Sequence, residues 1–142
     1  MNILISFLSS MIMLSTPTLI AALGIVFSER AGIVNIGTEG MMLMGALAGV
    51  IGSMVTGSVW LGVLIAMFVA MLFSAIFAFF TVVVKADQTV IGTGMNILAS
   101  GLTITVNRWV FGASTSPPRI DVFGKAAIPL LSDIPVLGPV LF

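Results

Sequence analysis

The chain contains 142 residues, of which 59% are hydrophobic and only 7% charged, and its mean hydropathy is +1.28. Soluble domains carry roughly 25% charged residues, so the composition indicates an integral membrane protein in a lipid bilayer. Five basic and five acidic side chains give no net charge, which excludes an electrostatic attraction to nucleic acid. Because Cys and His are absent, thiolate and imidazole metal sites and His-based catalysis are excluded, and we expect no metal, no cofactor and no enzyme activity in this chain.

Long tracts without any charged side chain predict the membrane spans. These tracts are residues 1–28, 40–84 and 88–107. Because a span needs about 20 apolar residues, the tracts predict four helices and an all-α transmembrane bundle over residues 1–111. The predicted spans cover about residues 3–27, 40–56, 59–84 and 89–111. The first tract lacks the basic start of a signal peptide, so we interpret it as a retained span.

The first predicted span contains a proline near its middle. Pro17 has no backbone N–H, and it disfavours helical dihedral angles at Thr16. We therefore expect the first helix to be kinked or broken at this point.

The stretch "GIVNIGTEG", residues 32–40, places polar side chains between two apolar spans. In one interpretation Thr38 caps the second span, and Glu39 lies in its first turn, where the helix dipole favours negative charge. In the other, residues 28–40 form a broken or re-entrant segment at membrane depth, and Asn35 and Glu39 face a cavity. The sequence leaves both interpretations open.

Small side chains recur with helical spacing in the second and third spans. Stripes of this kind let helix backbones approach closely in lipid. We interpret them as packing faces of a bundle rather than as part of a solute site. The second span contributes Gly45, Gly49, Ser53 and Gly57, and the third contributes Ala66, Ala70, Ser74 and Ala78.

A polar stripe follows one face of the fourth span. Its members are Asn96, Ser100, Thr103 and Asn107, at spacings that place them on one side of a helix. Lipid cannot satisfy such groups, so the stripe must face another helix or a water-filled path. Interhelical hydrogen bonding and the lining of a permeation path are both consistent with the pattern.

Residues 112–142 differ in composition from the rest of the chain, because they contain five of its six prolines. Short apolar groups alternate with turn residues, which is typical of an ordered loop rather than of a span. The closing "PVLGPVLF" is apolar, and we interpret it as the approach to a further span.

Three stretches of the sequence resemble one family of transport proteins. "LGIVFSERAGIVNIGTEGMMLMGALAG", residues 23–49, resembles the signature of the permease subunits of bacterial ATP-binding cassette importers for simple sugars and nucleosides, which are related more distantly to branched-chain amino acid permeases. "DQTVIGTGMNILASGLT", residues 87–103, is similar to a second signature of that group, and "IPLLSDIPVLGPVLF", residues 128–142, to the loop that follows it. Met41 is a departure, because relatives often carry Gln there.

The resemblance implies a multi-pass permease of the bacterial cytoplasmic (inner) membrane that works by alternating access. Family members are longer, so the chain looks like an N-terminal half, and residues 112–142 would lie outside the cell. The implied partners are a second permease subunit, cytoplasmic ATP-binding subunits and an extracytoplasmic substrate-binding lipoprotein. We expect the path for nucleosides or simple sugars to be lined by Asn35, Glu39, Gly92, Asn96 and Ser100.

Two other functions compete with the permease. An intramembrane enzyme is the less favoured of them, because without His or Cys it would need paired acids within the spans, and only Glu39 is near one. A small self-assembling channel or membrane scaffold protein would also show small-residue stripes and no catalytic motif. The ordered signatures favour the permease.

Overall fold

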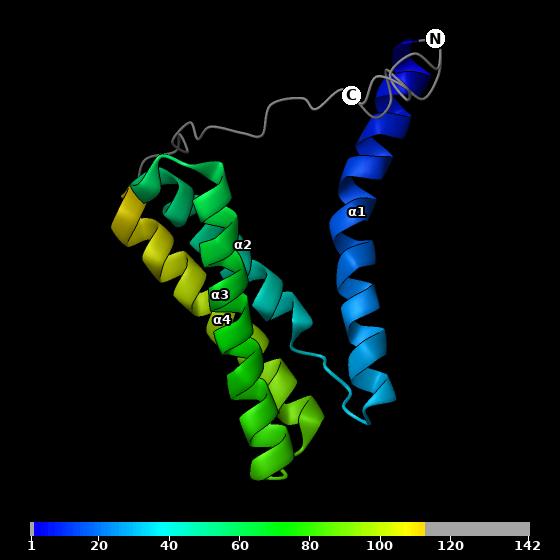
Figure 1. The fold of residues 1–142 in the computed structure, drawn as a ribbon, viewed down its shortest axis with the longest axis vertical. Coiled ribbons are helices and arrows are strands. Elements are labelled where there is room, and N and C mark those ends of the chain that lie inside the picture. Colours follow the sequence, from blue (N-terminus) through cyan, green and yellow to red (C-terminus); the bar gives the residue numbers. More distant parts are fainter. Residues whose placement is uncertain (1, 113–142) are drawn as a thin grey trace. The chain divides into compact units, whose positions relative to one another are not determined.

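The computed structural model of the chain describes residues 2–112, and every regular element among them is a helix. The elements are α1 (Asn2–Arg30), α2 (Thr38–Thr56), α3 (Val59–Ala78), the π-helical turn η1 (Phe79–Val83) and α4 (Gln88–Phe111) (Figure 1). Four helices are long and apolar enough to cross a membrane, with α3 and η1 forming one of them. The predicted all-α membrane fold with four spans is therefore confirmed. The loop predicted over residues 112–142 lies, apart from Gly112, outside the described residues.

The chain divides into two compact units between Gly24 and Ile25. The first contains most of α1. The helix runs unbroken through Pro17, so the break predicted there is wrong, whereas a kink stays a prediction. One missing N–H does not end a membrane helix, because nearby Ser and Thr hydroxyls can pair with the backbone. The Thr16 hydroxyl donates to the carbonyl of Ile12 at 2.7 Å, next to the Met13 carbonyl that Pro17 leaves without its helical donor.

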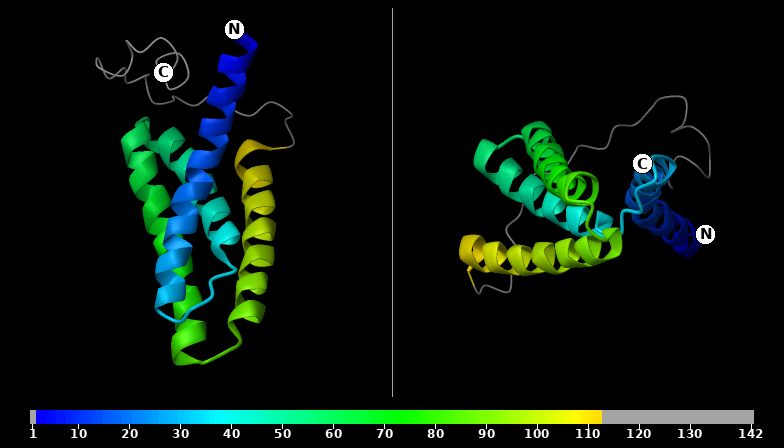
Figure 2. Two further views of the ribbon diagram at one scale, coloured as in Figure 1. Left: turned by 90° about the vertical axis from the view of Figure 1, so that its right-hand side faces the viewer. Right: turned by 90° about the horizontal axis from the view of Figure 1, so that it is seen from below.

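The second unit contains α2, α3, η1 and α4. Within it α2 packs against both α3 and α4, whereas α3 and α4 touch each other little (Figures 1 and 2). A small core of Met41, Phe77 and Met95 lies where the three helices meet. Ile33, from the segment that precedes α2, packs against this core. The polar stretch highlighted in the sequence is thus attached to the centre of the bundle.

The small-residue stripes of α2 and α3 face each other. A Cβ atom added at Gly45 would lie 3.6 Å from Ala70 Cβ, and one at Gly49 would lie 3.3 Å from Ala66 Cβ. The tightest contact is at Gly62, one turn before Ala66, where an added Cβ would lie only 2.9 Å from the carbonyl oxygen of Gly49. The α3 stripe therefore begins at Gly62, one turn before the predicted start at Ala66.

Two serines of these stripes have different surroundings. Ser53 lies in the interface, since a Cβ added at Gly62 would approach its Cβ to 2.9 Å. Ser74 is exposed in the described part of the chain, so the structure does not bring it into the α2–α3 contact.

The end of the third span is built from a π-helical turn followed by a left-handed residue. In η1 the Thr81 hydroxyl donates to the carbonyl of Phe77 at 2.9 Å. Lys85 then has a φ of 57°, and the Ala86 N–H donates to the carbonyl of Phe80 at 3.1 Å. The bond from Ala86 to Phe80 closes the last turn around Lys85, whose Cβ disfavours a positive φ.

We expect Gly62→Ala to destabilise the protein by about 1–3 kcal/mol, because its methyl group must displace the backbone of α2. Gly101→Ala is the matched control, since a Cβ at Gly101 meets nothing within 4 Å. Alanine at an open helical position favours the helix by roughly 0.5–1 kcal/mol. Thermal unfolding of the detergent-solubilised protein measures both effects, and equal midpoints for the two variants would contradict the close α2–α3 contact.

We expect Lys85→Gly to stabilise the same protein by about 1 kcal/mol, because glycine adopts positive φ without a clash between Cβ and the backbone. Lys85→Ala removes the same charge but keeps the Cβ. Only the glycine variant should therefore unfold at a higher temperature, and an equal rise in both variants would show that the charge matters instead.

Candidate functional site

The chain between α1 and α2 is non-helical over residues 31–37, which we call the inter-helix segment. α1 ends in two backbone bonds: the Gly32 N–H donates to the carbonyl of Glu29 at 2.9 Å, and the Ile33 N–H donates to the carbonyl of Ser28 at 3.0 Å. This pattern is a Schellman motif, which needs a left-handed residue, and Gly32 supplies it with a φ of 81°. The segment thus leaves α1 through a defined turn.

The first residue of α4 holds the beginning of this segment. The Gln88 Oε1 atom accepts a hydrogen bond from the Val34 N–H at 2.6 Å, and the Gln88 Nε2 atom donates to the carbonyl of Gly32 at 3.4 Å. Asp87 fixes where α4 starts, because its carboxylate accepts hydrogen bonds from the N–H groups of Thr89 and Val90 at 2.9 and 3.1 Å. Gln88 therefore projects from a well-capped helix end.

Two turns further along α4, Asn96 holds the end of the segment and the start of α2. Its Nδ2 atom donates to the carbonyl of Ile36 at 3.1 Å, and its Oδ1 atom accepts from the Gly40 N–H at 2.7 Å. The first N–H groups of a helix lack partners within that helix. One of these groups at the start of α2 is thus satisfied by a side chain of α4.

Glycines allow the backbones to come this close. A Cβ added at Gly92 would lie 2.9 Å from the Gly37 nitrogen and 3.1 Å from Ile36 Cβ. A Cβ added at Gly40 would lie 2.8 Å from Asn96 Oδ1. The Asn96 side chain is short, so it reaches the segment only because Gly40 and Gly92 have no Cβ that would push the two backbones apart.

The start of α2 differs from the expected capping arrangement. Gly37 occupies the N-cap position without a side-chain cap, and Thr38 is the first helical residue, so the predicted cap at Thr38 is wrong. The Thr38 hydroxyl instead donates back to the carbonyl of Asn35 at 3.0 Å. Asn96 takes over part of the capping from another helix, which a local sequence pattern cannot reveal.

Asn35 retains unused hydrogen-bonding capacity. Its side chain is half-buried, and its Nδ2 atom makes only a 3.6 Å contact to Met41 Sδ. Its Oδ1 atom is the one side-chain oxygen or nitrogen in the described, non-exposed part of the chain that is buried without a hydrogen-bond partner. A buried acceptor in this state costs free energy, so it indicates either a functional role or a partner outside the described residues.

The residues predicted to line a path thus separate into two groups. Gly92 and Asn96 lie against the inter-helix segment, next to Asn35. The side chains of Glu39 and Ser100 are exposed and make no hydrogen bond within the described unit. The rest of the α4 stripe also divides, because the Thr103 hydroxyl lies 3.7 Å from Met44 Sδ, whereas Asn107 is exposed.

Sequence reasoning missed Gln88. The available signal was the spacing of Gln88, Gly92 and Asn96, which places two amides and a glycine on one face of α4. Their partner is the backbone of the inter-helix segment. A hydrogen bond to a backbone group requires no particular residue type in the partner, so the sequence does not reveal it.

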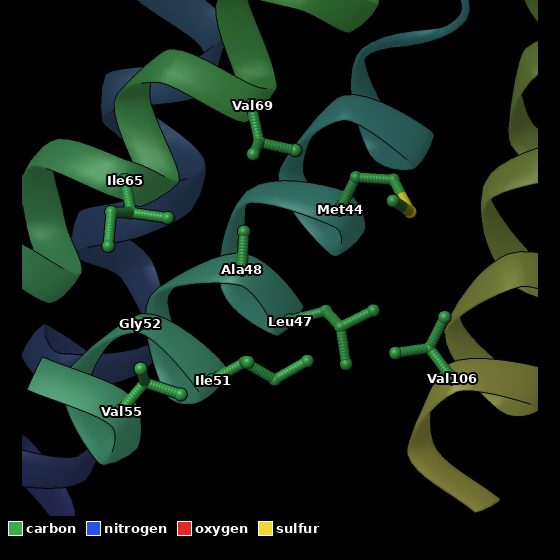
Figure 3. A pocket seen from close by; sticks show the side chains of 9 residues that line it. All are labelled: Met44, Leu47, Ala48, Ile51, Gly52, Val55, Ile65, Val69 and Val106. Carbon is green, nitrogen blue, oxygen red and sulfur yellow. The ribbon is translucent and has the colours of Figure 1, made fainter. Parts of the chain in front are cut away.

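An apolar hollow lies elsewhere in the same unit, between α2, α3 and α4 (Figure 3). Its volume is about 420 Å³, and no polar side chain lines it. It offers no group to bind a polar solute, so the polar contacts around the inter-helix segment form the better candidate site. The lining residues are Met44, Leu47, Ala48, Ile51, Gly52, Val55, Ile65, Val69 and Val106.

Residues 7–132 match the family described as the permease component of branched-chain amino acid transport systems. The chain belongs to this family. It is therefore a member of a family of transport subunits rather than of enzymes, and it is a multi-pass protein of the cytoplasmic membrane.

Three relatives are similar over most of this permease chain. The guanosine ABC transporter permease protein NupQ of Bacillus subtilis is 41% identical over 90% of the chain and 42% of its own length. The nucleoside ABC transporter permease protein NupC of Lactococcus lactis is 36% identical over 99% of the chain and 46% of its own length. The putative glucose ABC transporter permease protein TsgC13 of Haloferax volcanii is 34% identical over 95% of the chain and 41% of its own length. The chain thus spans less than half the length of these relatives, and no solved structure matches it.

We expect Asn96→Leu to destabilise the permease, because it leaves the Gly40 N–H and the Ile36 carbonyl without partners. The bond to the Gly40 N–H is part-buried, and a buried group left without a partner costs about 1–3 kcal/mol. Ser100→Leu lies one turn further along α4 at an exposed position and should change stability little. Thermal unfolding in detergent compares the two, and a similar loss in both would mean that the interhelical bonds of Asn96 contribute nothing specific.

Proposed function

We propose that this chain forms part of the membrane path of an ATP-binding cassette importer for nucleosides or simple sugars. The observation that carries the proposal is the similarity to permeases named for guanosine and for nucleosides, which extends over 90% and 99% of the chain. The path opens alternately to the two sides of the membrane. A second permease subunit completes it, cytoplasmic ATP-binding subunits supply the energy, and an extracytoplasmic lipoprotein delivers the solute.

The contacts of the predicted path residues divide them into two groups with different roles. Asn35, Glu39 and Ser100 retain hydrogen-bonding groups that no described residue uses, so we propose that they face the solute. Gly92 and Asn96 act behind them by holding the inter-helix segment on α4. Sugars and nucleosides present several hydroxyl groups, and a carboxylate such as Glu39 accepts hydrogen bonds from two of them at once. This chain contributes no cofactor.

Glu39 also lies in the first turn of α2, which supports a competing, purely structural role. A helix dipole gains about 0.3–1 kcal/mol from a charge at this position. Replacing the carboxylate by an amide of the same size would then reduce stability slightly and leave uptake nearly intact.

We expect Glu39→Gln to reduce the uptake of radiolabelled guanosine several-fold without reducing the amount of assembled transporter. The full-length permease is produced with its partner subunits in cells that lack other guanosine uptake. Glu29→Gln is the matched control, because Glu29 is an exposed carboxylate in the last turn of α1. Near-normal uptake in the Glu39 variant would mean that Glu39 serves α2 alone.

A further inference from the structure

We propose that Gln88 and Asn96 are positioning residues, which tie the backbone on both sides of Asn35 to α4 and thereby set how the Asn35 amide faces the solute. The proposal rests on the proposed function for the identity of the path. It adds Gln88, which the sequence analysis did not assign, and it gives Asn96 a role behind the path instead of on its surface.

The geometry fixes Asn35 from two directions. The Val34 N–H, just before Asn35, is bound by Gln88, and the Ile36 carbonyl, just after it, is bound by Asn96. The side chains of Val34 and Ile36 are exposed, whereas that of Asn35 is half-buried. Holding the two neighbours therefore determines which way the residue between them faces.

The position of the segment makes such a clamp necessary. Glu29 and Arg30 precede the segment, and Lys85 and Asp87 precede α4, so charged residues mark this end of the unit as the membrane surface. From Gln88 to Asn96 the contacts follow α4 inward by two turns, a rise of about 12 Å. Non-helical backbone at this depth needs partners from the protein, because lipid offers none.

Each end of the clamp combines an acceptor and a donor. Gln88 and Asn96 both accept from a backbone N–H and donate to a backbone carbonyl. A primary amide offers both functions on two separate atoms, and Gly92 between them lets the segment lie directly on the helix. An apolar residue at position 88 would leave the segment held at one end only.

The unused oxygen of Asn35 explains why its position matters. Asn35 Oδ1 is buried without a partner in the described residues, so this conformation is one that the side chain would not adopt by preference. A clamp on both neighbours holds it there. A small movement of the segment would expose this acceptor to a hydroxyl or amino group of the solute.

Thiol labelling tests the clamp without any transport measurement. Ile33 is half-buried against the core, and the chain has no native Cys, so Ile33→Cys reports whether the segment stays packed. In the full-length, otherwise cysteine-free transporter, Gln88→Met should raise the rate of maleimide labelling in unsealed membranes several-fold. Thr93→Met is the matched control, because exposed Thr93 bonds only to the carbonyl of Thr89 in its own helix. Equal labelling rates with Gln88→Met and Thr93→Met would overturn the proposal.

The uptake of guanosine tests whether Gln88 acts through Asn35. Gln88→Met and Asn35→Ala should each raise KM several-fold in assembled transporter, and the double variant should match Asn35→Ala alone. Gln88→Glu keeps the acceptor for the Val34 N–H and should recover most of the affinity. Independent effects that multiply in the double variant would overturn the positioning role and leave the proposed function intact. Normal uptake by Asn35→Ala would instead remove Asn35 from the path, which contradicts the proposed site itself.

Discussion

The structure depends on one requirement, which is that backbone outside a helix needs hydrogen-bond partners when it packs against a helical bundle. Between α1 and α2 the backbone leaves helical geometry over residues 31–37, so its N–H and carbonyl groups cannot all pair within a helix. A Schellman turn at Gly32 serves the end of α1. The amides of Gln88 and Asn96 serve the segment and the start of α2. Gly40 and Gly92 bring the backbones close enough for these bonds to form.

The two interfaces of α2 solve different problems. Against α3, the contact of Gly49 with Gly62 and Ala66 brings two regular helices together through small residues. Against α4, Gly40 and Gly92 provide equally close approach, but polar amides are added because the partner there is partly irregular backbone. Close packing alone is sufficient where both helices satisfy their own backbones. It is insufficient where one of them is interrupted.

Much of the fold could be predicted from the sequence, because hydropathy and small-residue spacing directly reflect burial in lipid and helix contact. The four spans and the facing stripes at Gly45, Gly49, Ala66 and Ala70 are of this kind. The predictions that failed involve the backbone. Of the two alternatives at Pro17, a kink or a break, the break did not occur, because membrane helices tolerate proline. Thr38 does not cap α2, because the cap is shared with Asn96 from a distant part of the chain. A residue whose partner is a backbone group, such as Gln88, carries no complementary residue that a pattern could detect.

The α4 stripe shows why polarity within a membrane helix does not by itself identify a solute path. Asn96 and Ser100 lie one turn apart on one face and were predicted to do the same thing. Asn96 uses both its amide nitrogen and its amide oxygen on the backbone, so its side chain is held in place by the segment. Ser100 is exposed, and its hydroxyl makes no hydrogen bond to another helix among the described residues. What distinguishes a supporting residue from a lining residue is therefore whether its donors and acceptors are already used. By that criterion the candidates for direct contact with a solute are Asn35, Glu39 and Ser100, and their arrangement depends on the amides that hold the segment behind them.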